Sequence, residues 1–349
     1  MDQMGGAELV VGVDTHLDTH TAALCDARGR VLGQLQVPAT AAGYEQLLCW
    51  ARAAAAARPL GWAIEGTRHY GLGLARHLAS HGEHVEEIEA ARHISKRRAG
   101  KSDPIDAIRA AREMLARPHP GQLRADGDRE VLRLLMIDRD NAVASAKTSR
   151  TALASVLVTA PAALRDRLRH IPAERRAQVC AALACPASAD RLTRTVHLTL
   201  IRLGQRAVAL AEVAASLEAQ IITLVEDMTP GLVRGEYGLG ALTAAQLLLS
   251  WSHAGRIRTE AAFAMLSGTS PVPASSGRTD RHRLNRLGDR QLNRALHVIA
   301  VSRMRGHPAT IAYVQRRRAE GKTDREIRRC IKRYLARHFY HALNRLDTT

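Results

Sequence analysis

The sequence is poor in aromatic residues, has no long apolar segment and contains fewer acidic than basic side chains. Phe, Trp and Tyr make up 3% of the 349 residues although 46% are hydrophobic, so alanine, leucine and valine have to fill the core. Alanine, leucine and arginine all favour helices. No uninterrupted apolar run reaches the 18 or more residues of a membrane span, and residues 1–6 lack the basic start and apolar stretch of a signal peptide. We therefore expect a largely helical, cytoplasmic protein without a membrane partner.

Cysteine is scarce and irregularly spaced. The five cysteines are Cys25, Cys49, Cys180, Cys185 and Cys330. Their number is odd and their spacing matches no zinc finger or zinc ribbon. We expect reduced thiols with mostly structural roles.

His16 and His20 have the spacing His-x-x-x-His. That spacing forms a zinc site on a helix, whereas here the surrounding residues predict a strand, a turn and a second strand. In an extended chain the two imidazoles are ~13 Å apart. We therefore predict that these two histidines do not share a zinc ion.

The charge balance indicates a polyanionic partner. Lys and Arg number 51 against 34 Asp and Glu, which gives a net charge of +17 and a pI of about 10.7. A folded chain has no internal use for this excess, and nucleic acid is the most common polyanion that proteins bind. A membrane surface is the alternative, but the basic residues are spread among apolar helical segments, which favours nucleic acid.

The first third alternates strand and helix patterns. Strands are predicted at 9–14, 19–25, 31–37, 61–65 and 84–88, and helices at 42–57, 72–80, 90–97 and 104–116. Three consecutive strands followed by strand–helix alternation is the order of a ribonuclease-H-like α/β fold. In that fold the first and fourth strands are neighbours.

The remainder is predicted to be helical, with boundaries near Pro118 and Pro230. These boundaries give an α/β domain at 1–118, a helical, possible coiled-coil region at 119–229 and a mainly α domain at 230–349. In the middle region Leu203, Leu210, Leu217 and Leu224 recur every seven residues. This repeat is typical of a long helix that pairs with another helix, and equally of a core stripe within one bundle. The chain ends in basic helices.

Four acidic residues form the strongest candidate site. Asp14 ends the first predicted strand and Glu65 ends the fourth, so their carboxylates should be adjacent. Asp103 and Asp106 are three residues apart and share one face of a helix. Clustered carboxylates repel one another and are relieved by divalent ions such as Mg²⁺ or Mn²⁺, which act on phosphodiesters. The alternative is structural, because Asp-Pro-Ile-Asp is also a typical helix start.

Gly238 and Gly240 precede a helix in an arrangement similar to a helix-hairpin-helix. Glycines allow the backbone to approach a phosphate, and the helix N-terminus offers free N–H groups. This pattern predicts a nucleic-acid contact, with an ordinary glycine turn as the equal alternative.

A Pro/Ser/Gly segment at 271–277 contains Ser275 and Ser276, whose hydroxyls could reach a phosphate. A linker is the usual role of such a segment. Five basic residues follow and could hold that phosphate: Arg278, Arg281, Arg283, Arg286 and Arg290.

Both ends of the chain resemble one known family. Gly12-Val-Asp14, Ala63-Ile-Glu65 and Ser102-Asp-Pro-Ile-Asp106 resemble the DEDD transposase domain of the IS-one-ten insertion-sequence family, which includes the Piv-like DNA invertases. The last third is similar to that family's C-terminal domain through Gly238-Leu-Gly240 and Pro271-Val-Pro-Ala-Ser-Ser-Gly277. The middle helices lie outside the resemblance.

The resemblance implies a RuvC-like domain in which Asp14, Glu65, Asp103 and Asp106 bind Mg²⁺, and a serine that attacks DNA. We expect Ser276 to be this nucleophile, with Ser275 as the alternative. The resemblance also implies a bacterial, nucleoid-associated transposase, assembly into dimers or tetramers, and a structured guide RNA from the same element. Thr15 and His16 after Asp14, and Pro104-Ile105 between the paired acids, depart from the family pattern without removing a ligand.

Two other functions remain open. A RuvC-like nuclease or junction resolvase would use water in place of the serine and leave no protein attached to DNA. A non-catalytic nucleic-acid-binding protein would bind independently of Mg²⁺.

Overall fold

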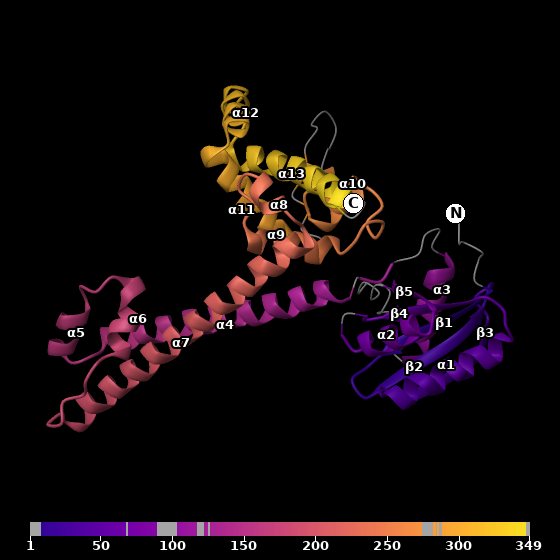
Figure 1. Cartoon of the computed structure of the whole chain (residues 1–349), viewed down its shortest axis with the longest axis horizontal. Coiled ribbons are helices and arrows are strands. Elements are labelled where there is room, and N and C mark those ends of the chain that lie inside the picture. Colours follow the sequence, from indigo (N-terminus) through magenta and orange to yellow (C-terminus); the bar gives the residue numbers. More distant parts are fainter. Residues whose placement is uncertain are drawn as a thin grey trace. The chain divides into compact units, whose positions relative to one another are not determined.

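The computed structural model forms two compact units, residues 1–124 and 125–349 (Figure 1). The structure describes residues 8–67, 69–88, 103–116, 122–124, 126–273, 282–283, 285 and 288–346. The first unit is an α/β domain and the second is almost entirely helical, as the sequence predicted.

The first unit is built on a five-stranded sheet with the order β3-β2-β1-β4-β5. Its strands are β1 (Leu9–Thr15), β2 (Thr19–Asp26), β3 (Val31–Pro38), β4 (Leu60–Glu65) and β5 (His84–Ile88). The pairs β1–β2 and β2–β3 are antiparallel, whereas β1–β4 and β4–β5 are parallel. This is the order expected for the ribonuclease-H-like fold, with β1 beside β4.

Helices cover both faces of this sheet. Helices α1 (Ala41–Ala55) and α2 (Leu72–Ser80) pack on one face, where Leu9, Val11 and Val13 of β1 are buried against them. Helix α3 (Asp103–Ala116) packs on the other face, where Val10 is buried. Alternate residues of β1 therefore serve two cores, which explains why nearly the whole strand is apolar. The helix predicted at 90–97 lies outside the described residues.

Two long helices form the frame of the second unit: α4 (Asp128–Val158) and α7 (Arg191–Met228). They pack along each other, and α5 (Ala162–Leu168) and α6 (Ala173–Ala181) lie at the end where α4 stops and α7 starts (Figure 1). Leu157 of α4 shares a cluster with Leu200 of α7, while Leu132 shares one with Val225, so the two helices are antiparallel.

Helices α4 and α7 are in contact along their length, and the buried residues of α7 follow a heptad-like pattern that differs in detail from the predicted one. The buried residues of α7 include Gly204, Ala207, Ala214, Leu217, Ile221 and Val225, which are spaced by three, four or seven positions. Of the four leucines in the predicted repeat, Leu217 is buried in this contact and the other three flank it, partly buried. Gly204 faces α6, where an added Cβ would lie 2.6 Å from the carbonyl oxygen of Ala177.

Helix α7 is long enough and apolar enough to cross a membrane when only length and composition are considered. The apolar sequence is interrupted by Glu212 and Glu218, and Glu218 accepts hydrogen bonds from Arg139 of α4. Core helices of other proteins meet the same criterion, so this feature alone does not indicate a membrane segment.

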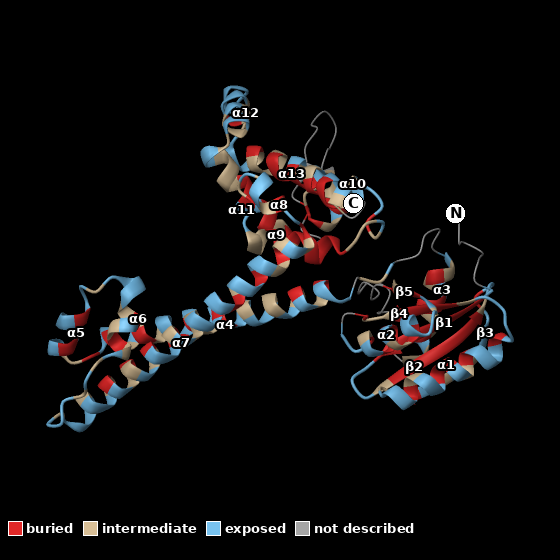
Figure 2. Cartoon of the chain, in the orientation of Figure 1, coloured by how far each residue is buried: buried red, intermediate tan, exposed pale blue. Residues whose placement is uncertain are grey.

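The C-terminal part of the second unit is a helical cluster. It contains α8 (Leu232–Gly235), α9 (Ala241–Trp251), α10 (Glu260–Leu266), α11 (Arg290–Gly306), α12 (Pro308–Ala319) and α13 (Asp324–Leu346), with a two-residue pair β6 (Val272–Pro273) and β7 (His282–Arg283). Buried side chains of α9, α11 and α13, among them Leu248, Leu296 and Phe339, form its core (Figure 2).

Candidate functional site

Asp14 and Glu65 lie side by side at the carboxyl ends of the neighbouring strands β1 and β4. Val13 of β1 is in register with Ile64 of β4, so the next residue of each parallel strand carries an acid. Side chains alternate along a strand, and Ala63 is buried in the cluster beneath α3. Glu65, two residues later, therefore emerges on the same face as α3.

Gly12 allows α3 to approach this edge. A Cβ atom at position 12 would lie 2.0 Å from the carbonyl oxygen of Ala107 and 2.5 Å from the amide nitrogen of Ala111. Any other residue would push the helix away from β1. The first turn of α3, with Asp103 and Asp106, is thereby held close to Asp14.

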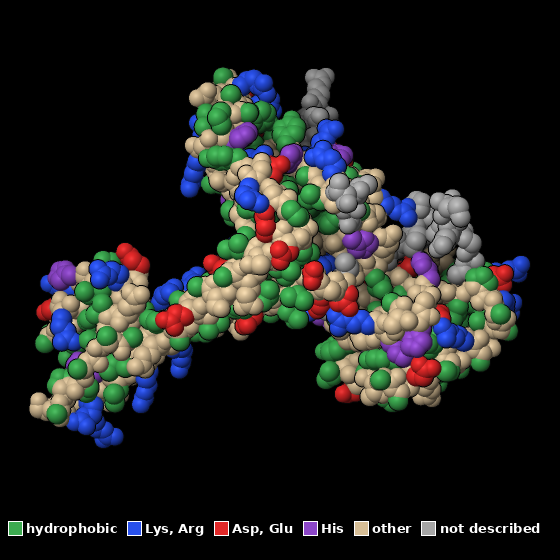
Figure 3. Space-filling model, in the orientation of Figure 1, with side chains coloured by type: hydrophobic (Ala, Val, Ile, Leu, Met, Phe, Trp, Pro, Cys, Tyr) green, Lys and Arg blue, Asp and Glu red, His purple; other side chains and the backbone are tan. Residues whose placement is uncertain are grey.

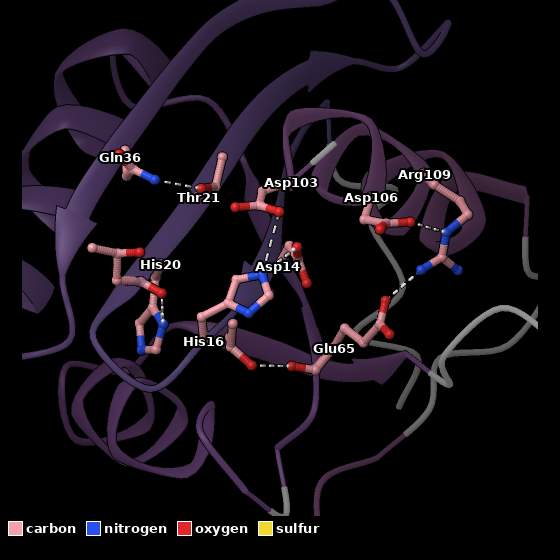
Figure 4. Close-up of polar contacts among 11 residues, drawn as sticks. Asp14, His16, His20, Thr21, Gln36, Glu65, Asp103, Asp106 and Arg109 are labelled. Atoms are coloured by element: carbon pink, nitrogen blue, oxygen red, sulfur yellow. Dashed lines mark hydrogen bonds and ion pairs between the residues drawn. The ribbon is translucent and has the colours of Figure 1, made fainter. Parts of the chain in front are cut away.

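His16 connects two of the acids. Its Nε2 atom lies 3.2 Å from Oδ2 of Asp14 and 3.4 Å from Oδ1 of Asp103 (Figure 4). The ligand atoms of these three residues all lie within 4.8 Å of one another. The adjacent Thr15 hydroxyl donates a hydrogen bond of 2.8 Å to the carbonyl oxygen of Glu65, which ties the end of β4 to β1.

Arg109 connects the other two acids. Its guanidinium forms an ion pair with Glu65, and its Nε lies 3.4 Å from Oδ1 of Asp106 (Figure 4). A third carboxylate, Glu113, lies 3.5 Å from Nη1. The four predicted acids thus lie together, and each is next to a basic side chain, either His16 or Arg109.

The electrostatics of Asp14 favour a bound cation. Burial raises the pKa of this carboxyl group, the neighbouring Asp106 and Asp103 raise it further, and His16 lowers it. A largely buried carboxylate surrounded by other acids is costly as a free anion. The carboxylate oxygens suit a hard divalent ion such as Mg²⁺ or Mn²⁺, and the His16 imidazole lies beside them, so the residues present fit a divalent cofactor.

Asp103 and Asp106 also lie in the first turn of α3. The helix dipole stabilises negative charge there, which agrees with the alternative interpretation of these two acids as a typical helix start. The two roles are compatible, because the same turn faces Asp14.

His16 and Arg109 were not among the predicted site residues. Arg109 follows Asp106 by one helical turn, a spacing that could have indicated a pair. Its contact with Glu65, 44 residues away, had no sequence signal. The sequence offered His16 as a metal ligand only together with His20, which is buried in β2 and stacks on Tyr44.

The second candidate site lies on the segment between α10 and α11. Ser275, Ser276, Arg278, Arg281 and Arg286 lie outside the described residues. The ends of the segment are joined by β6 and β7, with Val272 opposite Arg283 and Pro273 opposite His282. Arg290 is the first residue of α11 and is exposed.

Hydrogen bonds hold the base of this segment. Asp289 caps α11 by accepting from the backbone N–H groups of Gln291 and Leu292, and it also accepts a 2.7 Å hydrogen bond from Ser250. Asn293 donates to the carbonyl oxygen of Ser267 at 2.6 Å and accepts from Nζ of Lys332 at 2.7 Å.

Lys332 lies beneath this base and is 8% exposed. Burial lowers the pKa of its ammonium group, since removal from water disfavours the charged form. A buried lysine held by one amide places a cation beneath the first turn of α11. The sequence did not single it out among the many basic residues of the tail.

The two glycines before α9 differ in what they require. Gly238 has a φ of +80°, which favours glycine, and a Cβ there would lie 3.1 Å from Cβ of Ser302. Gly240 caps α9 with ordinary backbone angles, and an added Cβ would meet only the Thr243 hydroxyl at 4.0 Å. The positive φ explains glycine at 238, whereas a side chain would fit at 240.

Comparisons with known proteins agree with this organisation. Residues 11–160 match the family model of a DEDD transposase domain of IS110 type, described as "Transposase". Residues 233–315 match a second model, described as "Transposase IS116/IS110/IS902 family". Together they match about two thirds of the chain and contain every predicted site residue.

A curated relative supports the same relationship. A protein of Streptomyces coelicolor named "Insertion element IS110 uncharacterized 43.6 kDa protein" is 36% identical over 135 residues, which is 38% of this chain. The matched part spans a third of that protein's length. With an acidic site at the predicted positions and two family models in the expected order, the chain belongs to the IS110 family of transposases.

Proposed function

We propose that this chain is the transposase or site-specific recombinase of an insertion sequence, and that it cuts and rejoins DNA strands with two groups. One is the carboxylate cluster of Asp14, Glu65, Asp103 and Asp106. The other is the hydroxyl of Ser276. The observation that carries the proposal is the convergence of four acids from three elements around the buried Asp14, made possible by Gly12.

The acids would hold Mg²⁺ or Mn²⁺, which when bound supplies positive charge to stabilise developing negative charge on a phosphate. The chain's own residues position the reaction. Thr15 fixes the end of β4 against β1, and His16 and Arg109 keep the four carboxylates paired and oriented.

In the proposed step the oxygen of Ser276 attacks the phosphorus of a phosphodiester. A P–O bond to serine forms while the P–O bond to one deoxyribose oxygen breaks. The serine hydroxyl loses its proton as the bond forms, and the released deoxyribose oxygen takes up a proton and becomes a hydroxyl group. A DNA hydroxyl then attacks the phosphoserine, which restores the serine and forms a new phosphodiester. The number of phosphodiester bonds is conserved, so no external energy source is required.

Positive charge supports nucleic acid as the partner. Lys and Arg side chains extend along α4 and α7 and over α12 (Figure 3). On α7 these include the exposed Arg191, Arg194, Arg202 and Arg206. Such charge binds phosphates without regard to sequence. The family resemblance adds two further parts to the proposal. A structured RNA of the same element acts as guide, and the chain assembles into dimers or tetramers.

Covalent trapping tests the proposal. The purified chain is incubated with Mg²⁺, DNA of the element's ends and RNA transcribed from the element, then run on a denaturing gel. We expect a protein–DNA adduct that maps to Ser276, is lost in Ser276→Ala and persists in the matched Ser275→Ala. Asp14→Asn and Glu65→Gln should remove the adduct while the proteins stay folded.

Other outcomes would contradict parts of the proposal. A fully active Ser276→Ala protein would exclude this nucleophile. Cleaved DNA without attached protein would favour a RuvC-like nuclease that uses water. Mg²⁺-independent binding without any cleavage, also in the presence of total cellular RNA, would favour a non-catalytic binding protein.

A further inference from the structure

A second group of metal-binding side chains lies on the first unit, on helices α1 and α2. It consists of Glu45 of α1 and of His77 and His81 at the end of α2. One ligand atom from each lies within 4.8 Å of the other two. The family comparisons and the proposed strand transfer give these residues no role.

The distances suit a single metal ion. Oε2 of Glu45 lies 3.2 Å from Nε2 of His77 and 3.9 Å from Nε2 of His81. Ligands that each sit ~2.0–2.2 Å from a zinc ion in tetrahedral geometry are separated by roughly 3.3 Å. A small movement of His81 would bring its Nε2 into this range of Glu45.

The spacing of the histidines fits as well. His77 and His81 are four residues apart, and residues at this separation lie on one side of a helix. Their rings are 4.4 Å apart. This is the condition that His16 and His20 fail to meet, since they belong to extended chain.

The hydrogen bonds of His81 leave one nitrogen available. Its Nδ1 lies 2.7 Å from the carbonyl oxygen of His77. A carbonyl oxygen only accepts, so in the neutral ring Nδ1 carries the hydrogen and Nε2 has the free lone pair that faces Glu45. Metal-binding histidines commonly donate their second nitrogen to a carbonyl in this way.

His77 provides an independent indication. Its Nε2 is shielded from solvent, and it has no hydrogen-bond partner although the carboxylate of Glu45 is close by. A buried nitrogen without such a partner is costly, and coordination would satisfy it. Glu45 itself is oriented from the other side, because the thiol of Cys49 donates to its Oε1 at 3.4 Å.

We propose that Glu45, His77 and His81 bind one transition-metal ion of the Zn²⁺ class and that this ion links α1 to α2. Two imidazoles and one carboxylate suit Zn²⁺ or Co²⁺, whereas the four carboxylates around Asp14 suit Mg²⁺. The three protein ligands leave a fourth position for water or another ligand. The site is independent of the proposed strand transfer.

Cobalt titration tests this proposal. The full chain, without a polyhistidine tag and freed of metal with a chelator, is titrated with Co²⁺ while its visible absorption is recorded. We expect one equivalent of four-coordinate Co²⁺ that is displaced by Zn²⁺. His81→Gln and Glu45→Gln should each weaken binding at least about tenfold and leave the circular dichroism unchanged.

Two controls separate this site from others. His84 pairs with Glu86 alone, at 3.2 Å, so His84→Ala should leave Co²⁺ binding intact. Asp14→Asn should also leave it intact, which distinguishes the site from the group of Asp14, His16 and Asp103. Binding that survives His81→Gln but is lost in Asp14→Asn would overturn the proposal, as would the absence of any spectral change.

Discussion

Asp14 shows how a single residue can oppose stability while serving a site. Its side chain is 12% exposed and lies near two other acids. Burial raises its pKa, so the folded state holds the proton more tightly than the unfolded state. The resulting stabilisation is complete at acidic pH, below the unfolded pKa. It is lost as the pH rises through the raised folded pKa.

Asp14→Asn should therefore stabilise the metal-free protein at neutral pH, because it removes a buried negative charge without changing the size of the side chain. The melting temperature of both proteins, measured with a chelator from acidic to neutral pH, checks this. The gain should disappear at acidic pH and be absent in the exposed control Asp18→Asn. A less stable Asp14→Asn protein at neutral pH would show that the ionised carboxylate stabilises the fold.

Gly12 is the second residue on which the site depends. Gly12→Ala should destabilise the first unit by about 1–3 kcal/mol and abolish DNA cleavage, because the added Cβ meets backbone atoms of α3. Urea unfolding and a cleavage assay measure the two effects. The matched control Gly33→Ala places a Cβ 3.2 Å from the Trp50 side chain alone, and it should cost less and retain activity. Equal effects of both substitutions would refute the role of Gly12.

At the scale of elements, close contacts depend on small residues. A Cβ at Gly204 of α7 would lie 2.6 Å from the carbonyl oxygen of Ala177 and 2.6 Å from the amide nitrogen of Ala181. Helix α6 therefore rests directly on the backbone of α7, as α3 rests on β1. In both places one glycine determines where a whole helix lies.

Gly204→Ala should displace α6 and lower the stability of that contact by about 1–3 kcal/mol. Hydrogen exchange is expected to increase in α5 and α6 while α9, α11 and α13 stay protected, since those helices belong to a separate core. Gly235→Ala is the matched control, because nothing lies within 4 Å of its added Cβ. Loss of protection throughout the second unit would mean that its two cores unfold together.

At the scale of the whole molecule, net charge is the dominant property. The chain carries +17, and several basic residues of α13 are already paired with acids, such as Arg333 with Glu260. The unpaired excess remains available for phosphates. Charge of this kind acts over about one Debye length, and salt screens it.

DNA affinity should consequently fall steeply with salt. Each phosphate contact contributes a slope of about −0.9 to the plot of log K against log salt, so six or more contacts cost about 10³-fold between about 50 and 200 mM. Fluorescence anisotropy with DNA of unrelated sequence measures this slope. An affinity that is almost constant with salt would exclude phosphate contacts as the main source of binding.

The sequence by itself determined the order of strands and helices, the four acids and the charge. These features are local: apolar alternation marks β1, an acid ends each of two strands, and a Pro at the second position of α3 marks a helix start. The adjacency of Asp14 and Glu65 then followed from the fold class, because parallel neighbours end at the same edge of the sheet.

Only the tertiary structure decided which distant side chains meet. Arg109 reaches Glu65, α7 buries only Leu217 of the predicted leucine repeat, and Glu45 lies beside His77. No periodic pattern in the sequence predicts these contacts. Each joins two different helices or strands, and the packing of the domain determines how far apart those elements lie. Gly12 connects the two levels: the sequence shows a glycine in a strand, and only the approach of α3 explains why no side chain can stand there.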